Sequence, residues 1–444
     1  MQIGNQFNGD SLQSRHKLPD GATLMAITAP AYQSRHCATK VKIDGFLQIL
    51  ILTPLILVTQ TTDAQTYTVL HRFTHADGGF STGPLIQDDK GNFYGTTQIG
   101  RTSAEYGTVF KLNQQGAVIV LHTFTGKKDG GWPGEGVVRD AAGNFYGTTM
   151  TGGDPTCKLL QYYHGCGIIF KLTAAGKFSV LHTFSNKGSD GAIPSAGGAL
   201  LLDGGNLLGT TYMGGRYGKG TIFKISTTGS FSLVFSFGKT LDAGSPASGL
   251  LLMGGNLYGT SYGGTTSFGA VYKVDPHGKE TVLHSFKGAP DGELPNPVLV
   301  SDNAGNLYGT TGGGGNNYLG TVFKVNTDGT ETVIYSFSGA TDGDQPAAGL
   351  TWDAAGNLYG TTWGGGTGCD SQGCGTIFKL TPTASSWTET VVHNFDGDRG
   401  GGQPESVLFR DKFGNFYGMT TTGGLPQCNS GQRPGCGVAY KFAP

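Results

Sequence analysis

The chain has 444 residues and a net charge of −1, and charged side chains make up only 14% of it. A near-neutral chain without a basic run excludes a typical nucleic-acid-binding protein, which presents a basic face. Glycine is abundant, at 78 residues, but hydrophobic residues at 37% and aromatic residues at 11% are too frequent for a disordered chain.

The N-terminal region, residues 1–64, has the pattern of a secretory signal peptide with an unusually long leading segment. Its apolar run, 46–58, is too short to cross a bilayer, which needs about 20 residues. We expect cleavage after Ala64, no membrane span afterwards, and a secreted, periplasmic or cell-surface protein. An uncleaved anchor is the competing interpretation, and Met25 offers an alternative start.

Residues 65–444 contain seven copies of one unit, which we expect to form a single domain. Each copy carries a Gly-Asn pair, and successive pairs are 50 to 62 residues apart. The pairs end at Asn92, Asn144, Asn206, Asn256, Asn306, Asn357 and Asn415. Self-similarity at this period indicates an array of equivalent supersecondary units.

Within one copy, residues 342–395, four short β-rich runs are separated by clusters of Gly, Asn, Asp and Pro. This pattern predicts four antiparallel strands, A to D, and no helical periodicity is present. Radial repetition of such sheets gives a β-propeller, and a linear solenoid is the alternative. The first strand, 66–73, is of type D and the last, 437–442, is of type C, so the N-terminal strand can complete the last blade. We therefore predict an all-β, closed seven-bladed β-propeller of four-stranded antiparallel blades.

The repeating unit GNLYGTT…GG…GTVFKL…TVLHSF…DG resembles the Gloeobacter/Verrucomicrobia (GloVer) tandem repeat of bacterial secreted and surface proteins. The blades are also similar to those of NHL-type propellers. The resemblance covers residues 66–444 and implies an extracellular repeat protein without an assigned reaction.

Residues that recur in every copy are expected to hold the fold, because one ligand cannot contact seven equivalent places. Strand C carries a recurring lysine whose stem should pack on a neighbouring strand, although a basic ring for anions is the alternative. Strand D carries a histidine in five copies, and Phe235 and Tyr335 take its place in the others, which indicates aromatic packing rather than a metal ligand. The D–A loop carries an aspartate that we expect to fold onto nearby backbone amides.

Six cysteines follow the predicted cleavage site, in pairs within three B–C loops: Cys157 and Cys166, Cys369 and Cys374, Cys428 and Cys436. Local disulfides in an oxidising compartment are the simplest explanation. A zinc site that uses His164 is the alternative, but no loop offers four ligands at a suitable spacing. We expect no metal and no cofactor.

Function is expected where the copies differ. The B–C and D–A loops share the face around the channel mouth, and the B–C loops are elaborated only in blades 1, 2, 6 and 7, which lie on one side of the ring. Aromatic rings there could stack on sugars or peptides, although simple loop packing is the alternative. The candidate ligand-binding residues are Trp132, Tyr162, Tyr163, His164, Tyr212, Tyr262 and Trp363.

These features favour a secreted, monomeric binding module whose partner is a carbohydrate or an extracellular protein. The alternative is a polysaccharide-acting enzyme, a glycoside hydrolase or lyase, with acidic residues at the channel mouth. The weak catalytic candidates are Glu135, Glu293 and Glu405. Binding is favoured because the sequence has no nucleophile elbow, phosphate loop or metal-ligand run.

Overall fold

The computed structural model describes residues 65–100, 106–159, 164–194, 199–239, 243–247, 249–339, 341–369, 373–426, 428 and 435–444. The predicted signal peptide, the alternative start at Met25, and the candidates Tyr162 and Tyr163 lie outside these residues. The regular elements of the described part are the strands β1 to β32. None of its elements is a helix long and apolar enough to cross a membrane.

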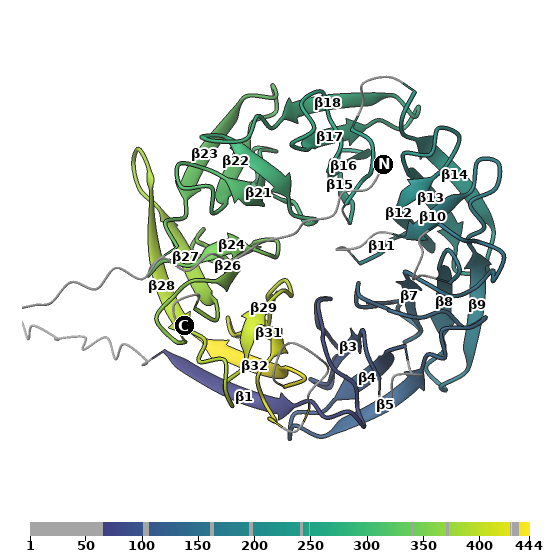
Figure 1. The fold of residues 1–444 in the computed structure, drawn as a ribbon, viewed down its shortest axis with the longest axis horizontal. Coiled ribbons are helices and arrows are strands. Elements are labelled where there is room, and N and C mark those ends of the chain that lie inside the picture. Colours follow the sequence, from purple (N-terminus) through teal and green to yellow (C-terminus); the bar gives the residue numbers. More distant parts are fainter. Residues whose placement is uncertain are drawn as a thin grey trace, which may run out of the picture. The chain divides into compact units, whose positions relative to one another are not determined.

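Blades 1 to 4 are antiparallel sheets, and in blade 3 strand A is split into two pieces (Figure 1). Blade 1 consists of β2 (Ile86–Gln87), β3 (Phe93–Thr97), β4 (Thr108–Leu112) and β5 (Val118–Thr123). Blade 2 consists of β6 (Val138–Arg139), β7 (Phe145–Thr149), β8 (Ile168–Leu172) and β9 (Phe178–Thr183). Blade 3 consists of β10 (Gly191–Pro194), β11 (Leu201–Asp203), β12 (Asn206–Gly214), β13 (Thr221–Ser226) and β14 (Phe231–Ser236). Blade 4 consists of β15 (Leu251–Met253), β16 (Asn256–Ser261), β17 (Ala270–Val274) and β18 (Glu280–Ser285).

Blades 5 to 7 follow the same plan, each with strand A in two pieces. Blade 5 consists of β19 (Gly292–Pro295), β20 (Val300–Ser301), β21 (Leu307–Gly314), β22 (Thr321–Val325) and β23 (Glu331–Ser336). Blade 6 consists of β24 (Asp344–Pro346), β25 (Thr351–Trp352), β26 (Leu358–Gly364), β27 (Thr376–Pro382) and β28 (Trp387–Asn394). Blade 7 consists of β29 (Gly402–Pro404), β30 (Phe409–Arg410), β31 (Phe416–Thr422), β32 (Val438–Ala443) and β1 (Thr66–Arg72).

The seven blades form a ring with strand A near the centre and strand D at the rim (Figure 1). The ring closes because β1 pairs antiparallel with β32, with Tyr67 opposite Phe442. The Tyr67 ring stacks on His393 of blade 6 at a centroid distance of 3.8 Å, and its hydroxyl donates to Gly400 O at 2.6 Å. The N-terminal strand therefore serves as strand D of the last blade and also packs on the blade before it, which confirms the predicted closed propeller.

The turn from strand A to strand B is built around an aspartate carboxylate. In blade 7, Asp411 accepts hydrogen bonds from the backbone N–H groups of Phe413 and Asn415, both at 2.9 Å. It also accepts from Asn415 Nδ2 at 2.8 Å and from the Tyr417 hydroxyl at 3.0 Å. Burial alone would raise the pKa of Asp411, but these hydrogen bonds outweigh it and hold the pKa below its ordinary value. The repeated Asp-x-x-Gly-Asn-x-Tyr motif is therefore a structural turn.

The core of each blade depends on close contact between strands B and C. A Cβ atom on Gly309 of strand B would lie 2.6 Å from Cζ of Phe323 on strand C, and Phe323 is fully buried. A side chain at Gly309 would displace the phenylalanine from its site. The glycine of the repeated Tyr-Gly-Thr segment is thus required for interior packing.

The recurring lysines and histidines have the packing roles that the sequence predicts. The Lys171 ammonium lies 5.3 Å from the centroid of the Tyr146 ring on the adjacent strand, and the His182 ring stacks on Phe231 at 3.9 Å. The sequence analysis did not predict that these histidines also pair with the D–A loop aspartates. The Nε2-to-carboxylate distances are 2.8 Å for His71–Asp77, 3.5 Å for His122–Asp129, 3.1 Å for His182–Asp190 and 3.1 Å for His284–Asp291.

Consecutive blades are joined by a repeated backbone hydrogen bond, and we call the boundary between two blades a blade seam. The donor is a residue in the left-handed region, such as Trp132 with φ of 58°, and the acceptor is the B–C loop of the preceding blade, here Tyr106 O at 2.7 Å. The donors at the seven seams are Phe80, Trp132, Ile193, Ser245, Leu294, Gln345 and Gln403. Since the conformation is shared by all seams, it belongs to the architecture rather than to one site.

Tyr67→Ala is expected to lower the free energy of unfolding by about 3 kcal/mol, because truncation of a packed aromatic removes buried contacts. The loss should be seen in guanidinium unfolding followed by intrinsic fluorescence. Thr68→Ala, an exposed neighbour on β1, is the matched control and should change stability by less than about 0.5 kcal/mol. Equal effects of the two substitutions would show that the Tyr67 contacts do not hold the ring closed.

Asp411→Ala is expected to destabilise the protein by about 2–3 kcal/mol, because it leaves buried donors of the turn without an acceptor. The control is Asp203→Ala, since Asp203 begins the shorter A–B turn of blade 3, where it pairs with Asn206 and is exposed. A group with a lowered folded-state pKa stabilises above its unfolded pKa and loses that effect as the pH falls. The difference between wild type and Asp411→Ala should therefore shrink below about pH 4, and a pH-independent difference would contradict this account.

Candidate functional site

A pocket of about 220 Å³ lies on the ring axis, where the loops that lead into strand A of the blades come together. Its walls come from every blade except blade 3. Gln98, Met150 and Tyr262, which directly follow strand B in their blades, contribute part of the lining. The pocket is therefore the mouth of the central channel on the side of the B–C and D–A loops, and we call it the central pocket.

Two of the three acidic candidates line the central pocket. Glu135 of blade 2 is only 4% exposed, and Glu405 of blade 7 accepts a hydrogen bond from Trp363 Nε1 at 3.1 Å. Glu293 is not among the lining residues, because it lies on β19 opposite Gly313, before the left-handed residue of its loop. The structure thus brings together Glu135 and Glu405 and separates Glu293 from them.

Aromatic candidates gather beside these carboxylates. Tyr262 lines the central pocket, and the Tyr212 ring meets it edge-on at a centroid distance of 6.1 Å. Burial raises the pKa of Tyr262, and Tyr212 and the carboxylate of Glu135 add to the shift. Glu135 of blade 2 and Tyr262 of blade 4 thus line the same pocket, although blade 3 lies between their blades in the ring.

The remaining described candidates lie at the loops of blades 1 and 2. His164 is exposed and lines a separate cavity of about 440 Å³ together with Tyr106, Lys127 and Lys128. Trp132 adjoins this cavity through its seam hydrogen bond to Tyr106. Sequence reasoning therefore combined two groups of residues, one in the central pocket and one at these loops.

The three cysteine pairs form disulfides, with Cα–Cα distances of 5.7 Å for Cys157–Cys166, 5.6 Å for Cys369–Cys374 and 5.5 Å for Cys428–Cys436. The cysteines are thus not zinc ligands. The second cysteine of each pair supplies the carbonyl oxygen of a seam hydrogen bond. Each disulfide therefore fixes a B–C loop at the point where it contacts the next blade, which stiffens the face formed by the B–C and D–A loops.

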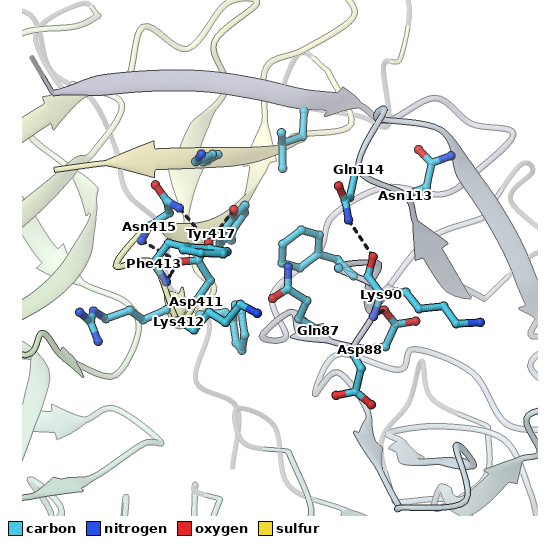
Figure 2. Close-up of a pocket in the computed structure, with 17 residues that line it drawn as sticks. Gln87, Asp88, Lys90, Asn113, Gln114, Asp411, Lys412, Phe413, Asn415 and Tyr417 are labelled. Carbon is cyan, nitrogen blue, oxygen red and sulfur yellow. Dashed lines mark hydrogen bonds between the residues drawn. The ribbon is translucent and has the colours of Figure 1, made fainter. Parts of the chain in front are cut away.

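A larger cavity of about 770 Å³ lies at the other end of the blades, between blades 7 and 1. Figure 2 shows Phe413 and Tyr417 on one wall and Gln87 and Gln114 on the other. Most of its polar lining belongs to the A–B and C–D turns of the repeat, whose carboxylates already accept turn hydrogen bonds. Three copy-specific candidates, Glu135, Tyr262 and Glu405, line the central pocket instead, which makes that pocket the better candidate site.

The sequence analysis missed two polar residues of the central pocket. Asn296 donates to Thr310 Oγ1 at 3.0 Å, and Thr82 accepts from Gln98 Nε2 at 3.0 Å. Asn296 directly follows the proline of its D–A loop, as Glu405 does. A comparison of that repeat position across the copies would have identified Asn296.

Comparison with curated protein sequences finds no match. Among solved structures, the chain is similar to a streptogramin B lyase, with 13% identity, a TM-score of 0.52, and coverage of 85% of this chain and 97% of the other. It is also similar to the extracellular domain of a protein from B. thetaiotaomicron assigned to a one-component system, with 9% identity and a TM-score of 0.50. That match covers 85% of this chain and 40% of the other. At these identities the similarity concerns the fold alone.

The sequence model of the Gloeobacter/Verrucomicrobia repeat family matches residues 56–200 and 161–372, which together make up more than half of the chain. The matched ranges contain six of the seven Gly-Asn turns, those that end at Asn92, Asn144, Asn206, Asn256, Asn306 and Asn357. The chain therefore belongs to the Gloeobacter/Verrucomicrobia repeat family.

Proposed function

We propose that this protein is an extracellular binding module whose central pocket receives the end of a carbohydrate chain. The observation that carries the proposal is the grouping of Tyr262, Glu135 and Glu405 in one pocket at the channel mouth. Small-molecule sites characteristically combine apolar or aromatic walls with a few convergent polar groups.

The chemistry of the lining suits a sugar. Aromatic faces such as that of Tyr262 can pack on the apolar face of a sugar ring, while carboxylate and amide groups bond its hydroxyls. The amide of Gln98 adds a donor beside the two carboxylates, whereas the amide nitrogen of Asn296 already donates to Thr310 Oγ1 and Pro346 O. At about 220 Å³ the pocket is smaller than the roughly 300–1,000 Å³ of sites that enclose a drug-sized ligand, so it would take a terminal unit.

An extracellular or envelope location is supported by the three disulfides and by the repeat family. Disulfides persist in oxidising compartments, where surface glycans are found. The disulfide-held loops would also reduce the conformational entropy lost on binding, because they are already ordered at the seams.

A second candidate function is cleavage of a polysaccharide, and it is favoured by one observation, the presence of both Glu135 and Glu405 in the same pocket. Glycoside hydrolases place two carboxyl groups on either side of the scissile bond, about 5 to 9.5 Å apart. Shortening of a bound polysaccharide, abolished by Glu135→Gln or Glu405→Gln, would establish this function in place of simple binding.

Tyr262→Ala and Trp363→Ala are each expected to weaken glycan binding by about 30-fold, which corresponds to about 2 kcal/mol for an aromatic anchor. Tyr262 supplies the stacking face, and Trp363 orients the Glu405 carboxylate. The measurement is a glycan-array screen of the purified protein, followed by calorimetric titration of any glycan that binds.

The matched control is Phe413→Ala, because Phe413 is a 78% exposed aromatic in the cavity at the opposite end of the blades. This variant should bind as tightly as wild type. Loss of binding in Phe413→Ala alone would move the site to the opposite face. Absence of any glycan ligand would contradict the carbohydrate proposal and favour an extracellular protein partner.

A further inference from the structure

At four blade seams the strand-D residue that pairs with the residue after the strand-C lysine lies beside the strand-D histidine of the preceding blade. At two seams that residue is a phenylalanine: Phe178 stacks on His122 and Phe231 stacks on His182, both at 3.9 Å. The fold thus stacks a neutral aromatic ring on a histidine that is already paired with an aspartate.

At the seam between blades 4 and 5, a residue of a different type lies beside the histidine. Glu331, the first residue of β23, replaces the phenylalanine beside His284 of β18 and its partner Asp291. One ligand atom from each of these three side chains, a ring nitrogen and two carboxylate oxygens, lies within 4.8 Å of the other two. Among the described residues, the one other cluster with this geometry contains two disulfide-bonded cysteines, which cannot bind a metal in that form.

The cost of burying the Glu331 carboxylate is not fully offset by hydrogen bonds at this seam. Its Oε1 atom is buried from solvent and has no hydrogen-bond partner within the described part of the chain. Burial raises the pKa of Glu331 to about 7, and the neighbouring Asp291 adds to the shift, while His284 and Lys287 oppose it. Two carboxylates close together in a half-buried site are a costly arrangement unless a cation neutralises them.

We propose that His284, Asp291 and Glu331 form a binding site for a divalent transition-metal ion, with Zn²⁺ as the best fit, that links blades 4 and 5. Zn²⁺ is bound by histidine nitrogen and carboxylate oxygen, and sites with three protein ligands leave a position for water. The sequence analysis expected no metal, because it judged each histidine only as a recurring packing residue.

The geometry requires little rearrangement. In a tetrahedral site with zinc–ligand bonds of about 2.1 Å, two ligand atoms lie about 3.4 Å apart. The three atoms here lie within 4.8 Å of one another, so the largest separation must close by at most ~1.4 Å. His284 Nε2 and Asp291 Oδ2 are already 3.1 Å apart. Asp291 is held in place because it accepts hydrogen bonds from the backbone N–H groups of Lys287 at 3.0 Å and Gly292 at 2.8 Å. The exposed Lys287 side chain can turn into solvent when a cation binds.

Zn²⁺ titrated into chelator-treated protein, with its disulfides intact, is expected to bind at this seam and to raise the unfolding temperature. Glu331→Gln and His284→Phe should each weaken the binding by at least ~10- to 100-fold, the loss caused by removal of even an outer-shell partner. His284→Phe should retain the fold, because Phe235 fills the same position in blade 3. Calorimetric titration and thermal unfolding measure the two effects.

Two controls use the other seams of the same chain. His182→Phe removes an equivalent histidine that faces Phe231 rather than a glutamate, so Zn²⁺ affinity should not change. Phe231→Glu places a third ligand beside His182 and Asp190 and should add a second zinc site. Zn²⁺ binding that survives both Glu331→Gln and His284→Phe, or no binding at millimolar Zn²⁺, would overturn the proposal.

The affinity should also depend on pH in one direction. Zn²⁺ needs the deprotonated Glu331 carboxylate and a neutral imidazole, so its affinity should fall as the pH drops. Binding should release protons into the buffer near neutral pH, which calorimetry in buffers of different ionisation enthalpy detects. An affinity that is equal at pH 5.5 and pH 7.5 would contradict coordination by Glu331.

Discussion

The propeller depends on a single backbone hydrogen bond repeated at its seven seams. Its donor adopts a left-handed conformation even where the residue is as bulky as Trp132 or Phe80. Such a conformation is unfavourable by roughly 1–3 kcal/mol for a residue with a side chain, so it persists only because its surroundings enforce it. At six seams the next residue is a proline with a restricted backbone, and the acceptor is the fixed end of a B–C loop. The same contact therefore sets the angle between blades and the position of every loop around the central pocket.

The number of blades and the closure of the ring could be predicted because both depend on local patterns. The number of blades follows from the number of Gly-Asn turns. In five blades the turn is held by an aspartate four residues before the asparagine, so no distant contact is needed to form it. Closure was predictable because an unmatched D-type strand at one end complements an unmatched C-type strand at the other. The structure adds what no pattern could show: Tyr67 closes the ring by stacking on His393 of blade 6 as well as by joining β32.

The central pocket was only partly predictable, because its residues meet through the closure of the whole ring. Glu135, Tyr262 and Glu405 are far apart in sequence, and each carries no local signal that it faces the channel. The contrast with Glu293 gives the physical reason. Glu135 and Glu405 follow the left-handed residue and proline of their D–A loops, whereas Glu293 precedes the left-handed Leu294. The left-handed conformation of that residue interrupts the regular alternation of side chains along the strand, so the period of the sequence does not show which side chains line the pocket.

Repetition also explains how a nearly symmetric fold acquires distinct sites. In three successive blades a glutamate of strand D, Glu280, Glu331 or Glu389, pairs with the residue after the strand-C lysine, but the residue that each one meets in the preceding blade differs. Glu280 accepts a hydrogen bond from Ala243 N at 3.0 Å, and Glu389 lies near Tyr335 and Asp342, where burial raises its pKa to about 7. Of these three glutamates, Glu331 alone meets a histidine. The scaffold supplies the same paired histidine and aspartate at several seams. The identity of the one strand-D residue that the next blade places beside the histidine therefore decides whether a seam remains an apolar contact or gains the ligands of the proposed metal site.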